Sequence, residues 1–519
     1  MIPDAGPDGP HTIRTGVPAM LRPLSLTVLA LALVACGGKA EKPVTPKTDA
    51  KGDLRYGRLV FKPCTLGGDT GQSVDAQCAT LMAPENPAAP DGRRIGLAVA
   101  MIPAKNLAAA DPVVIIAGGP GQSILDSYPM LHDALGDVRR SRNVLLMDAR
   151  GTGGSHLLQC EELTGLDDTS AESEDPARMR ALTERCRDRL AKNADLRFYG
   201  TAEHIRDLDL LRESIGVGRL NLAGISYGTR VAQQYAARYP KHTRTVTLDS
   251  IAPNTLVLGQ EHAQNLDAAI KRQFARCVAD TACKRNIGDP ATLLAQVRTT
   301  LQGGGLAAVR YRDPTSGEWR EEVPRFAHLG ALLRFYAYRP ESASMLPLIL
   351  HDAAQGRYET LLSQARALSG DVGDSMALGM HLSVSCTEDP EIRSRPEDEN
   401  TIMGNSIAEF IQAQCAVWPK GTRDPDFRKP LSGDVPVLAI SGELDPVTPP
   451  RYGDDVVKTL PKGRHLVLPG QGHSVLTTGC MPKLYAQFVE TADAKALDAE
   501  CLKRLKASPP FAGYYGWEP

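Results

Sequence analysis

Residues 224–228, with the sequence GISYG, contain a serine whose surroundings suit nucleophilic catalysis. The apolar segment 219–223 precedes them, and the helix-like segment 229–235 follows them. A G-x-S-x-G turn between a strand and a helix exposes the serine hydroxyl on a strained turn that its glycines permit. The bare motif is common by chance, so its strand–turn–helix context carries the prediction. We therefore expect Ser226 to be a nucleophile.

A serine hydroxyl is a weak nucleophile and needs a histidine base that an acid orients. His473 is the preferred base because it lies in a glycine-rich loop, residues 470–474 (GQGHS), shortly after a predicted strand. Asp445 is the preferred acid because it lies in the turn after the preceding predicted strand. Asp249, at the end of another strand, and Glu443, in a different loop register, are the alternatives. We expect surface or satisfied core roles for other histidines, including His204, His328, His351 and His381.

Donors for the oxyanion of a tetrahedral intermediate are the next requirement. One donor is expected to be the backbone N–H of the residue after the nucleophile, here Tyr227. The other is expected in a loop after an early strand, which residues 118–123 (GGPGQS) supply. Pro120 has no N–H, so Gly119 is the preferred donor and Gly121 the reserve. The Gly-Lys-Ser/Thr ending of a nucleotide-binding loop is absent, which excludes a phosphate cradle.

A second glycine-rich loop, residues 148–155 (DARGTGGS), also follows a predicted strand. We expect a structural turn near the site, in which Asp148 and Arg150 hold loops by hydrogen bonds. Direct contact with substrate is the alternative.

Short apolar runs alternate with helix-like stretches along the chain and predict strands at 112–117, 143–148, 219–224, 245–249, 435–441 and 464–468. Continuous apolar strands between helices indicate a parallel sheet covered on both faces, so the fold class is α/β, doubly wound. Helical crossovers are expected at 201–215 and 228–239. The long segment 252–430 has helix-like stretches at 262–279, 325–338 and 343–367. We interpret it as a helical cap over the carboxyl ends of the strands, where ligands bind in this architecture.

The charge composition argues against two classes of partner, nucleic acids and anionic surfaces. The chain has 519 residues, with 59 Lys plus Arg against 61 Asp plus Glu and a formal net charge of -2. This balance gives no electrostatic footprint for nucleic acid or for an anionic surface. We therefore expect no nucleic-acid partner. The oligomeric state is not readable from the sequence.

The N-terminus predicts export. Residues 1–35 are interpreted as a signal peptide, with Met20 as an alternative start, because one Arg precedes a short apolar segment and small residues. The apolar segment 23–35 is well short of the ~20 residues that cross a bilayer as a helix.

Residues 33–36 (LVAC) resemble the lipobox of bacterial lipoproteins. The resemblance implies cleavage before Cys36 and lipidation of that cysteine, which would anchor the protein to a membrane that faces the periplasm. An ordinary cleaved signal with an incidental cysteine is the alternative. Residues 36–52 are polar and are expected to be a flexible tether. Gly37, where inner-membrane lipoproteins carry aspartate, favours the outer membrane.

The cysteine count agrees with an oxidising compartment. There are 11 cysteines, and removing Cys36 leaves 10, an even number. Connectivity cannot be deduced from sequence, and up to five disulfides between sequential neighbours are the simplest prediction: Cys64/Cys78, Cys160/Cys186, Cys277/Cys283, Cys386/Cys415 and Cys480/Cys501. No cysteine or histidine cluster has metal-ligand spacing, so no metal and no cofactor is expected.

Together these motifs resemble the prolyl and tripeptidyl aminopeptidase family of α/β-hydrolases. The matching motifs, in matching order, are GGPG at 118–121, D-x-R-G-x-G-x-S at 148–155, GISYG at 224–228, GELDPVTP at 442–449 and GQGH at 470–473. The resemblance implies a helical cap and a C-terminal part, from about residue 415, like that of tripeptidyl aminopeptidases. With the cap at 252–430, the hydrolase core is expected in two parts, 53–251 and 431–519. It also implies the residue roles expected above: Ser226 with Asp445 and His473, and Gly119 with Tyr227 at the oxyanion.

The sequence departs from the family at two positions. Ala117 precedes the GGPG loop where prolyl iminopeptidases usually carry histidine, and Pro446 replaces a glutamate that binds the substrate amino group in some relatives. Glu388, in residues 385–389 (SCTED), resembles an acidic segment that follows the cap in tripeptidyl aminopeptidases. A carboxylate can balance a substrate ammonium by a charge-assisted hydrogen bond. Glu388 is therefore a candidate for amino-group recognition, with a solvated loop acid as the alternative.

The leading hypothesis is an exported serine hydrolase that releases short N-terminal peptides or amino acids through an acyl-enzyme. The alternative enzyme is a carboxylesterase that acts on small esters or lactones, because the same triad serves both reactions. A third hypothesis is a surface-binding lipoprotein that keeps the fold without catalysis. The intact set of serine, histidine and aspartate argues against it.

Overall fold

The computed structural model describes residues 45–49, 53–67, 71–163, 175–374 and 376–517, without the side chains of 369–374. These residues belong to one compact unit. The predicted signal peptide, Cys36 and most of the predicted tether lie outside the described residues. Within the described ranges, no helix has both the length and the apolar character that crossing a membrane requires.

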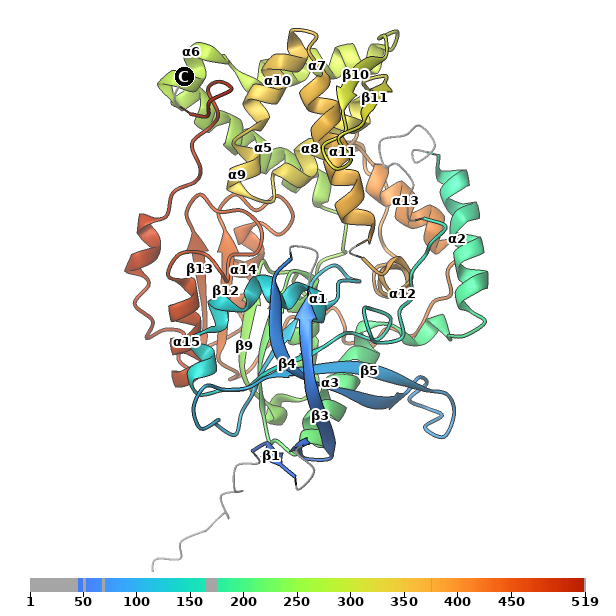
Figure 1. Cartoon of the computed structure of the whole chain (residues 1–519), viewed down its shortest axis with the longest axis vertical. Helices are drawn as coiled ribbons and strands as arrows, with labels where there is room; N and C mark the ends of the chain where they lie inside the picture. The colour runs from blue at the N-terminus through green and yellow to red at the C-terminus, as the bar shows by residue number, and fades with distance from the viewer. Residues whose placement is uncertain (1–44, 50–52, 68–70, 164–174, 375, 518–519) are drawn as a thin grey trace, which may run out of the picture. The chain divides into compact units, whose positions relative to one another are not determined.

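The continuous apolar runs of the sequence form the parallel part of a central sheet. In the described chain this sheet has 11 strands, in the order β1-β2-β3-β4-β5-β7-β6-β8-β9-β12-β13. Figure 1 shows β12 and β13 on the left of the core and β3, β4 and β5 to their right. All neighbours from β7 onward are parallel. Each of these strands coincides with a predicted strand: β6 (Val113–Ile116), β7 (Val144–Met147), β8 (Leu220–Ile225), β9 (Thr243–Asp249), β12 (Val437–Gly442) and β13 (Gly463–Leu468). The α/β fold class is therefore confirmed.

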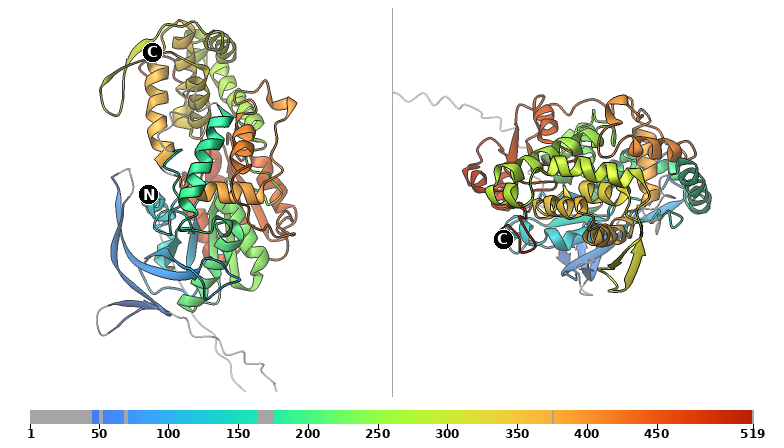
Figure 2. Two further views of the ribbon diagram at one scale, coloured as in Figure 1. Left: turned by 90° about the vertical axis from the view of Figure 1, so that its right-hand side faces the viewer. Right: turned by 90° about the horizontal axis from the view of Figure 1, so that it is seen from above.

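The other edge of the sheet is antiparallel and was not predicted. Its strands are β1 (Lys47–Thr48), β2 (Leu54–Tyr56), β3 (Leu59–Gly67), β4 (Ser73–Pro84) and β5 (Arg94–Ile102), and β5 joins it to β7. The long β3–β4 hairpin curves along one side of the core (Figure 2, blue). These strands mix exposed and buried residues, because solvent covers part of them, so a search for continuous apolar runs misses them.

Helices cover both faces of the sheet, as a doubly wound fold requires. Along β6, Val114 and Ile116 belong to one hydrophobic cluster and Val113 and Ile115 to the other. The first cluster includes side chains of α3 and α4, and the second includes side chains of α15. The helices outside the segment 252–430 are α1 (Ile124–Ser127), α2 (Pro176–Leu190), α3 (Thr201–Ile215), α4 (Tyr227–Arg238), α14 (Pro450–Val457) and α15 (Met481–Thr491).

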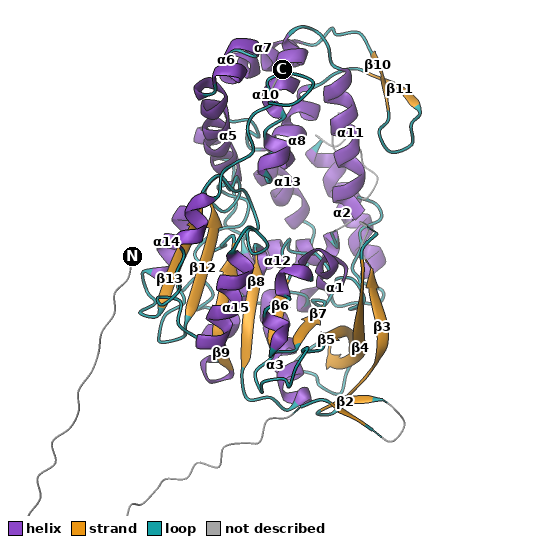
Figure 3. Ribbon diagram, turned by 60° about the vertical axis from the view of Figure 1, so that its left-hand side comes forward, coloured by secondary structure: helices purple, strands orange, loops and turns teal. Residues whose placement is uncertain are grey.

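The cap segment between β9 and β12 lies beyond the ends of the strands (Figure 3). Its first part has its own hydrophobic cluster and comprises α5 (His262–Ala279), α6 (Thr281–Asn286), α7 (Pro290–Gly303), α8 (Phe326–Tyr336), α9 (Pro340–Ala343), α10 (Leu346–Ala354) and α11 (Glu359–Asp374). The helix predicted at 343–367 is divided, because the chain turns at Gly356, whose φ is 79°. An antiparallel hairpin, β10 (Val309–Arg312) and β11 (Trp319–Glu322), was not predicted.

The last part of the segment 252–430 packs differently. Helices α12 (Leu378–Glu388) and α13 (Ser406–Cys415) follow α11. Met380 and Val384 of α12, with Trp418 after α13, belong to the hydrophobic cluster of the core sheet and not to that of the cap. Helix α12 therefore packs against the core and does not belong to the cap.

Five disulfides join neighbouring parts of the described chain, and all five pairings are the sequential ones predicted. Cys64–Cys78 links β3 to β4, and Cys277–Cys283 links α5 to α6. The others are Cys160–Cys186, Cys386–Cys415 and Cys480–Cys501.

Candidate active site

Ser226 occupies a strained turn between β8 and α4. Its φ is 54° and its ψ is -121°, a conformation that costs a residue with a side chain about 1–3 kcal/mol and persists only where the surroundings impose it. A Cβ atom at Gly224 would overlap the backbone of Gly228, and one at Gly228 would overlap the backbone of Ile116. Both glycines are thus required by the close packing of α4 against β8 and β6. The turn has the geometry expected of a nucleophile elbow.

His473 and Asp445 are hydrogen-bonded to each other. The distance from His473 Nδ1 to Asp445 Oδ2 is 2.8 Å. Asp445 is buried, and its Oδ1 accepts from the backbone N–H groups of Val447 and Thr448, both at 2.8 Å. The backbone N–H of His473 donates to the Tyr338 carbonyl at 2.8 Å. The imidazole is therefore oriented from two sides, and Nε2 is the ring nitrogen left to accept a proton.

Asp445 and His473 each stabilise the charged form of the other, as the pKa shifts of both residues show. Burial by itself would raise the pKa of Asp445, but the facing His473 and the hydrogen bonds to the carboxylate hold that pKa below its ordinary value. Burial by itself would lower the pKa of His473, but the Asp445 carboxylate raises it above the ordinary value of 6.5. The arrangement stabilises an imidazolium, the species that a general base becomes after it takes a proton.

The two alternative acids have other partners. Asp249 accepts hydrogen bonds from the backbone N–H groups of Val475 and Leu476, both at 2.9 Å, and burial raises its pKa to about 6. Glu443 Oε2 accepts from the backbone N–H of Gly470 at 2.7 Å. Both side chains therefore hold the loop that carries His473, one on each side of it.

The predicted oxyanion loop, residues 118–123, packs against the turn that carries Ser226. A Cβ atom at Gly118 would lie 3.1 Å from the Ser226 Cβ, so the backbone of this loop passes directly beside the nucleophile. Gly119 has a φ of 102°, which favours glycine. Within the described part of the chain, the backbone N–H groups of Gly119 and Tyr227 donate no hydrogen bond. Both are thus available to an oxyanion at Ser226.

The 148–155 loop holds the predicted oxyanion loop, residues 118–123, through hydrogen bonds. Asp148 accepts hydrogen bonds from Ser123 Oγ at 2.8 Å and from the Gly154 backbone N–H at 3.0 Å. Arg150 is buried and forms two hydrogen bonds of 2.7 Å with the Asp207 carboxylate. These contacts agree with the structural role expected for Asp148 and Arg150.

A cavity of about 1290 Å³ contains the elbow and the histidine. Ser226, Tyr227, Gly119 and His473 all line it. Its other walls come from the cap, including residues of α5, α8 and α11, and from α12. A volume of this size accommodates a short peptide or an ester with a sizeable acyl group. Across the described residues, no group of three His, Cys, Asp or Glu side chains could hold a metal ion.

Three polar cavity residues were not predicted to belong to the site. His262 of α5, Arg334 of α8 and His381 of α12 line the cavity. His381 was expected to have a surface or core role, but its Nδ1 lies 3.3 Å from the Pro120 carbonyl of the oxyanion loop. No sequence motif marks these positions, because helices far apart in the chain bring them together.

Glu388 does not line this cavity. It is 3% exposed, and its carboxylate accepts from the Thr201 backbone N–H at 2.7 Å and from Thr201 Oγ1 at 2.9 Å. Arg230 lies 3.8 Å away on its other side. The carboxylate is therefore engaged inside the protein, and the expected role in binding a substrate amino group finds no support in this geometry. Among the described residues, the acids that line the cavity are Asp249 and Glu341.

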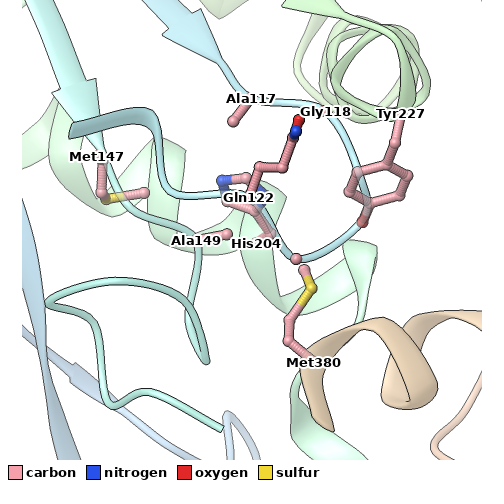
Figure 4. A pocket seen from close by; sticks show the side chains of 9 residues that line it. Ala117, Gly118, Gln122, Met147, Ala149, His204, Tyr227 and Met380 are labelled. Carbon is pink, nitrogen blue, oxygen red and sulfur yellow. The ribbon is translucent and has the colours of Figure 1, made fainter. Parts of the chain in front are cut away.

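A much smaller cavity, of about 10 Å³, lies behind the oxyanion loop (Figure 4). Gly118, Gln122, Tyr227 and His204 are among its lining residues. Neither ring nitrogen of His204 has a hydrogen-bond partner within the described chain, and burial lowers the pKa of this histidine to about 3. His204 is therefore neutral and differs from the satisfied core histidine that was expected.

Comparisons with known proteins agree with this architecture. The model of the family described as alpha/beta hydrolase fold matches residues 111–479. Serine protease Hip1 of Mycobacterium tuberculosis is 24% identical over 92% of this chain and 96% of its own length. Tripeptidyl aminopeptidase of Streptomyces coelicolor is 24% identical over 83% of this chain and 84% of its own length. Carboxylesterase B of Mycobacterium tuberculosis is 30% identical over 85% of this chain and 90% of its own length.

These matches span both parts of the core as well as the cap, in agreement with the resemblance inferred from the motifs. The chain belongs to the alpha/beta hydrolase fold family and is an enzyme similar to its tripeptidyl aminopeptidase-like members.

Proposed function

We propose that this enzyme is a serine hydrolase that removes short N-terminal pieces from peptides through an acyl-enzyme. The observation that carries the proposal is a single cavity lined by the Ser226 elbow, by His473, which Asp445 holds, and by the backbone amides of Gly119 and Tyr227, which donate to no other described residue. Nucleophile, base, orienting acid and oxyanion donors are the complete set that acyl transfer needs.

The reaction follows from these positions. Ser226 Oγ attacks the substrate carbonyl while His473 Nε2 takes the hydroxyl proton, and the Asp445 carboxylate stabilises the imidazolium. The N–H groups of Gly119 and Tyr227 donate to the oxyanion. Collapse of the intermediate breaks the amide bond, and His473 returns its proton to the leaving amine. Water then repeats these steps on the acyl-enzyme and releases the N-terminal product.

The peptide substrate is supported by the relatives named serine protease and tripeptidyl aminopeptidase. A covered cavity also favours short or unfolded substrates over folded proteins. Cleavage of small esters is the second candidate, because the relative named carboxylesterase B shares 30% identity with this chain. The same elbow and oxyanion donors serve both substrate classes.

We further propose that the protein is exported and anchored through a lipid on Cys36, preferentially in the outer membrane. The five disulfides support an oxidising compartment. Metabolic labelling with a fatty-acid probe is expected to mark the full-length protein, and Cys36→Ala is expected to abolish the label. A label that persists in this variant would refute lipidation at Cys36.

The activity test compares proline-, alanine- and tripeptide-linked fluorogenic amides, each with a free or an acylated N-terminus, and includes p-nitrophenyl butyrate. Purified wild type, Ser226→Ala and the control Ser127→Ala are measured together. Ser127 lines the same cavity outside the elbow. The proposal expects amide cleavage that requires a free amine and that is lost only in Ser226→Ala.

The outcomes separate the two substrate classes. Cleavage of the ester alone would move the assignment to carboxylesterase. Cleavage of the acylated amides at the same rate as the free ones would exclude an aminopeptidase and indicate an endopeptidase. Equal activity of Ser226→Ala and wild type would remove Ser226 from the mechanism.

A further inference from the structure

Arg334 of α8 is a half-buried cation in the wall of the proposed catalytic cavity. Its guanidinium lies 5.0 Å from the centre of the Phe335 ring. Within the described part of the chain it forms no hydrogen bond and no ion pair. A half-buried guanidinium whose donors face a cavity can bind an anion that enters it.

Other buried or cavity-lining arginines of the protein differ from Arg334 because each has a carboxylate partner. The buried Arg150 and Arg230 are paired with Asp207 and Asp389 at 2.7 Å and 2.8 Å. Arg366, which also lines the cavity, lies 3.4 Å from Asp313. Arg334 has no such carboxylate within the described residues.

Two neutral histidines and a tyrosine share the space around Arg334. Burial, together with the nearby Arg334 charge, lowers the pKa of His262 to about 3. Burial also lowers the pKa of His381, again with a contribution from Arg334. Burial raises the pKa of Tyr338, which the Arg334 charge partly offsets. All three side chains line the cavity. His262 and Tyr338 each keep an N–H or O–H that can donate a hydrogen bond, whereas the N–H of the neutral His381 faces the Pro120 carbonyl.

The acids that line the cavity do not compensate this charge. Asp249 is buried and engaged with the loop amides of Val475 and Leu476. Glu341 is exposed at the cavity edge. The wall around Arg334 therefore presents a cation and neutral donors to whatever occupies the cavity.

We propose that Arg334, with His262 and Tyr338 beside it, forms a subsite for a carboxylate of the substrate. Guanidinium groups bind carboxylates with two parallel hydrogen bonds, and such bonds strengthen in a cavity that excludes water. The inference rests on the proposed function, because it uses the same cavity and the same nucleophile. The carboxylate has two possible sources: an acidic side chain of the peptide, or the free C-terminus of a short peptide.

The test uses matched substrate pairs with wild type, Arg334→Gln and the control Arg310→Gln. One pair of peptides differs by Glu against Gln, and a second pair differs by a free against an amidated C-terminus. A third pair consists of p-nitrophenyl esters whose acyl chains end in a carboxylate or in a methyl group. Arg310 belongs to the cap hairpin, stacks on Trp319 at 4.5 Å and does not line the cavity.

In wild type and in Arg310→Gln, we expect kcat/KM to favour the acidic member of at least one peptide pair, and of the ester pair, by about tenfold or more. In Arg334→Gln the ratio of kcat/KM for the acidic substrate to that for the neutral one is expected to fall to about 1. In Arg334→Lys the ratio is expected to be intermediate, because an ammonium keeps the positive charge but cannot form the two parallel hydrogen bonds of a guanidinium. The pair that responds identifies the source of the carboxylate. Because no carboxylate among the described residues pairs with Arg334, the thermal midpoint of Arg334→Gln is expected to equal or exceed that of wild type.

A ratio near 1 in wild type, or an unchanged ratio in Arg334→Gln, would overturn the subsite. A fall of several degrees in the midpoint of Arg334→Gln would also overturn it, because it would show a structural partner. The ester pair separates this inference from the proposed function. An enzyme that cleaves no amide would refute the aminopeptidase, while the acidic and neutral esters would still report on Arg334.

Discussion

At the scale of single residues, the proposed chemistry depends on the hydrogen-bond partners of two buried aspartates, Asp445 and Asp249. Asp445 has the imidazole of His473 on one oxygen and backbone donors on the other, and its pKa is held low. Asp249 is equally buried, but its donors are loop amides, and its pKa is raised to about 6. Partners, not burial, therefore distinguish the orienting acid from the loop anchor.

Replacing each aspartate by asparagine tests this distinction. Asp445→Asn is expected to lower kcat on the order of 10⁴-fold, because the imidazole loses the carboxylate that orients it and stabilises its charge. Asp249→Asn keeps an oxygen that can accept from the loop, so its kcat is expected to fall far less. Steady-state kinetics on one ester substrate measure both. A larger loss in Asp249→Asn would make Asp249 the catalytic acid.

The acidic limb of the pH profile belongs to His473. Only the neutral imidazole can take the proton from Ser226, and Asp445 raises the pKa of His473 above 6.5. Activity is therefore expected to be lost as the pH falls through a value above 6.5, and to be present above it. The midpoint of kcat/KM against pH measures this value. A midpoint below 6.5 would contradict the coupling between the two residues.

At the scale of elements, Glu388 joins the end of α12 to the start of α3 through Thr201. The adjacent Asp389 holds Arg230 of α4 at 2.8 Å and Arg428 at 2.7 Å. This buried network fixes α12 against the helices of the core. Burial raises the pKa of Glu388 to about 7, so in the folded protein its protonated form persists well above the ordinary value of 4.5.

The raised pKa predicts how stability depends on pH. The stabilising contribution of Glu388 is complete below its unfolded value of 4.5 and is lost as the pH rises through about 7. The thermal midpoint of wild type, relative to Glu388→Gln, is therefore expected to fall over this window. The change in free energy of unfolding is on the order of 3 kcal/mol. Differential scanning fluorimetry from pH 4.5 to 8 measures it.

Glu391 provides the control. It is 42% exposed. Burial by itself would raise its pKa, but the hydrogen bond from Arg423 and the charges of Arg423 and Arg428 together lower it, so Glu391→Gln should give a small trend of opposite sign. A flat difference between wild type and Glu388→Gln would contradict the buried network. A KM increase in Glu388→Gln that is confined to substrates with a free amine would instead restore amino-group recognition by Glu388.

At the scale of the whole molecule, the disulfides reinforce core and cap separately. Cys277–Cys283 lies within the first part of the cap, with a sequence separation of 6, whereas Cys386–Cys415 joins α12 to α13 with a separation of 29. Every one of the five links near neighbours in the sequence, with separations from 6 to 29. None of them ties the two parts of the core to each other.

Loss of the longer link is expected to cost more. Replacing both cysteines of Cys386–Cys415 by alanine should lower the free energy of unfolding by about 3–4 kcal/mol, against about 2 kcal/mol for Cys277–Cys283, because a longer loop gains more entropy in the unfolded chain. Thermal midpoints of the two double variants, with wild type in reductant alongside, measure the order. Equal losses would indicate that native strain, and not loop entropy, sets the effect.

The sequence by itself determined the features that depend on local chemistry. The elbow needs glycines at 224 and 228, and continuous apolar runs precede the loops of the candidate site; both features lie in adjacent residues. The pairing of each cysteine with its sequential neighbour was the simplest prediction, which the structure decided. The parallel strands were therefore predicted, and so were the positions of Ser226, Asp445 and His473 in loops after them. The antiparallel edge strands were missed because solvent covers part of them and interrupts their apolar pattern.

Tertiary structure alone decided which residues surround the nucleophile. Glu388 lies in a segment that resembles a substrate-binding motif, yet α12 directs it into the core against Thr201. Arg334 and His262 lie in helices without any motif, yet the cap brings both to the cavity of Ser226. A side chain's partners depend on how distant elements pack, and packing is a sum of many small contacts that no short segment encodes. The positions of the candidate acid, base and nucleophile in loops after strands are therefore local information, whereas the lining of the cavity is not.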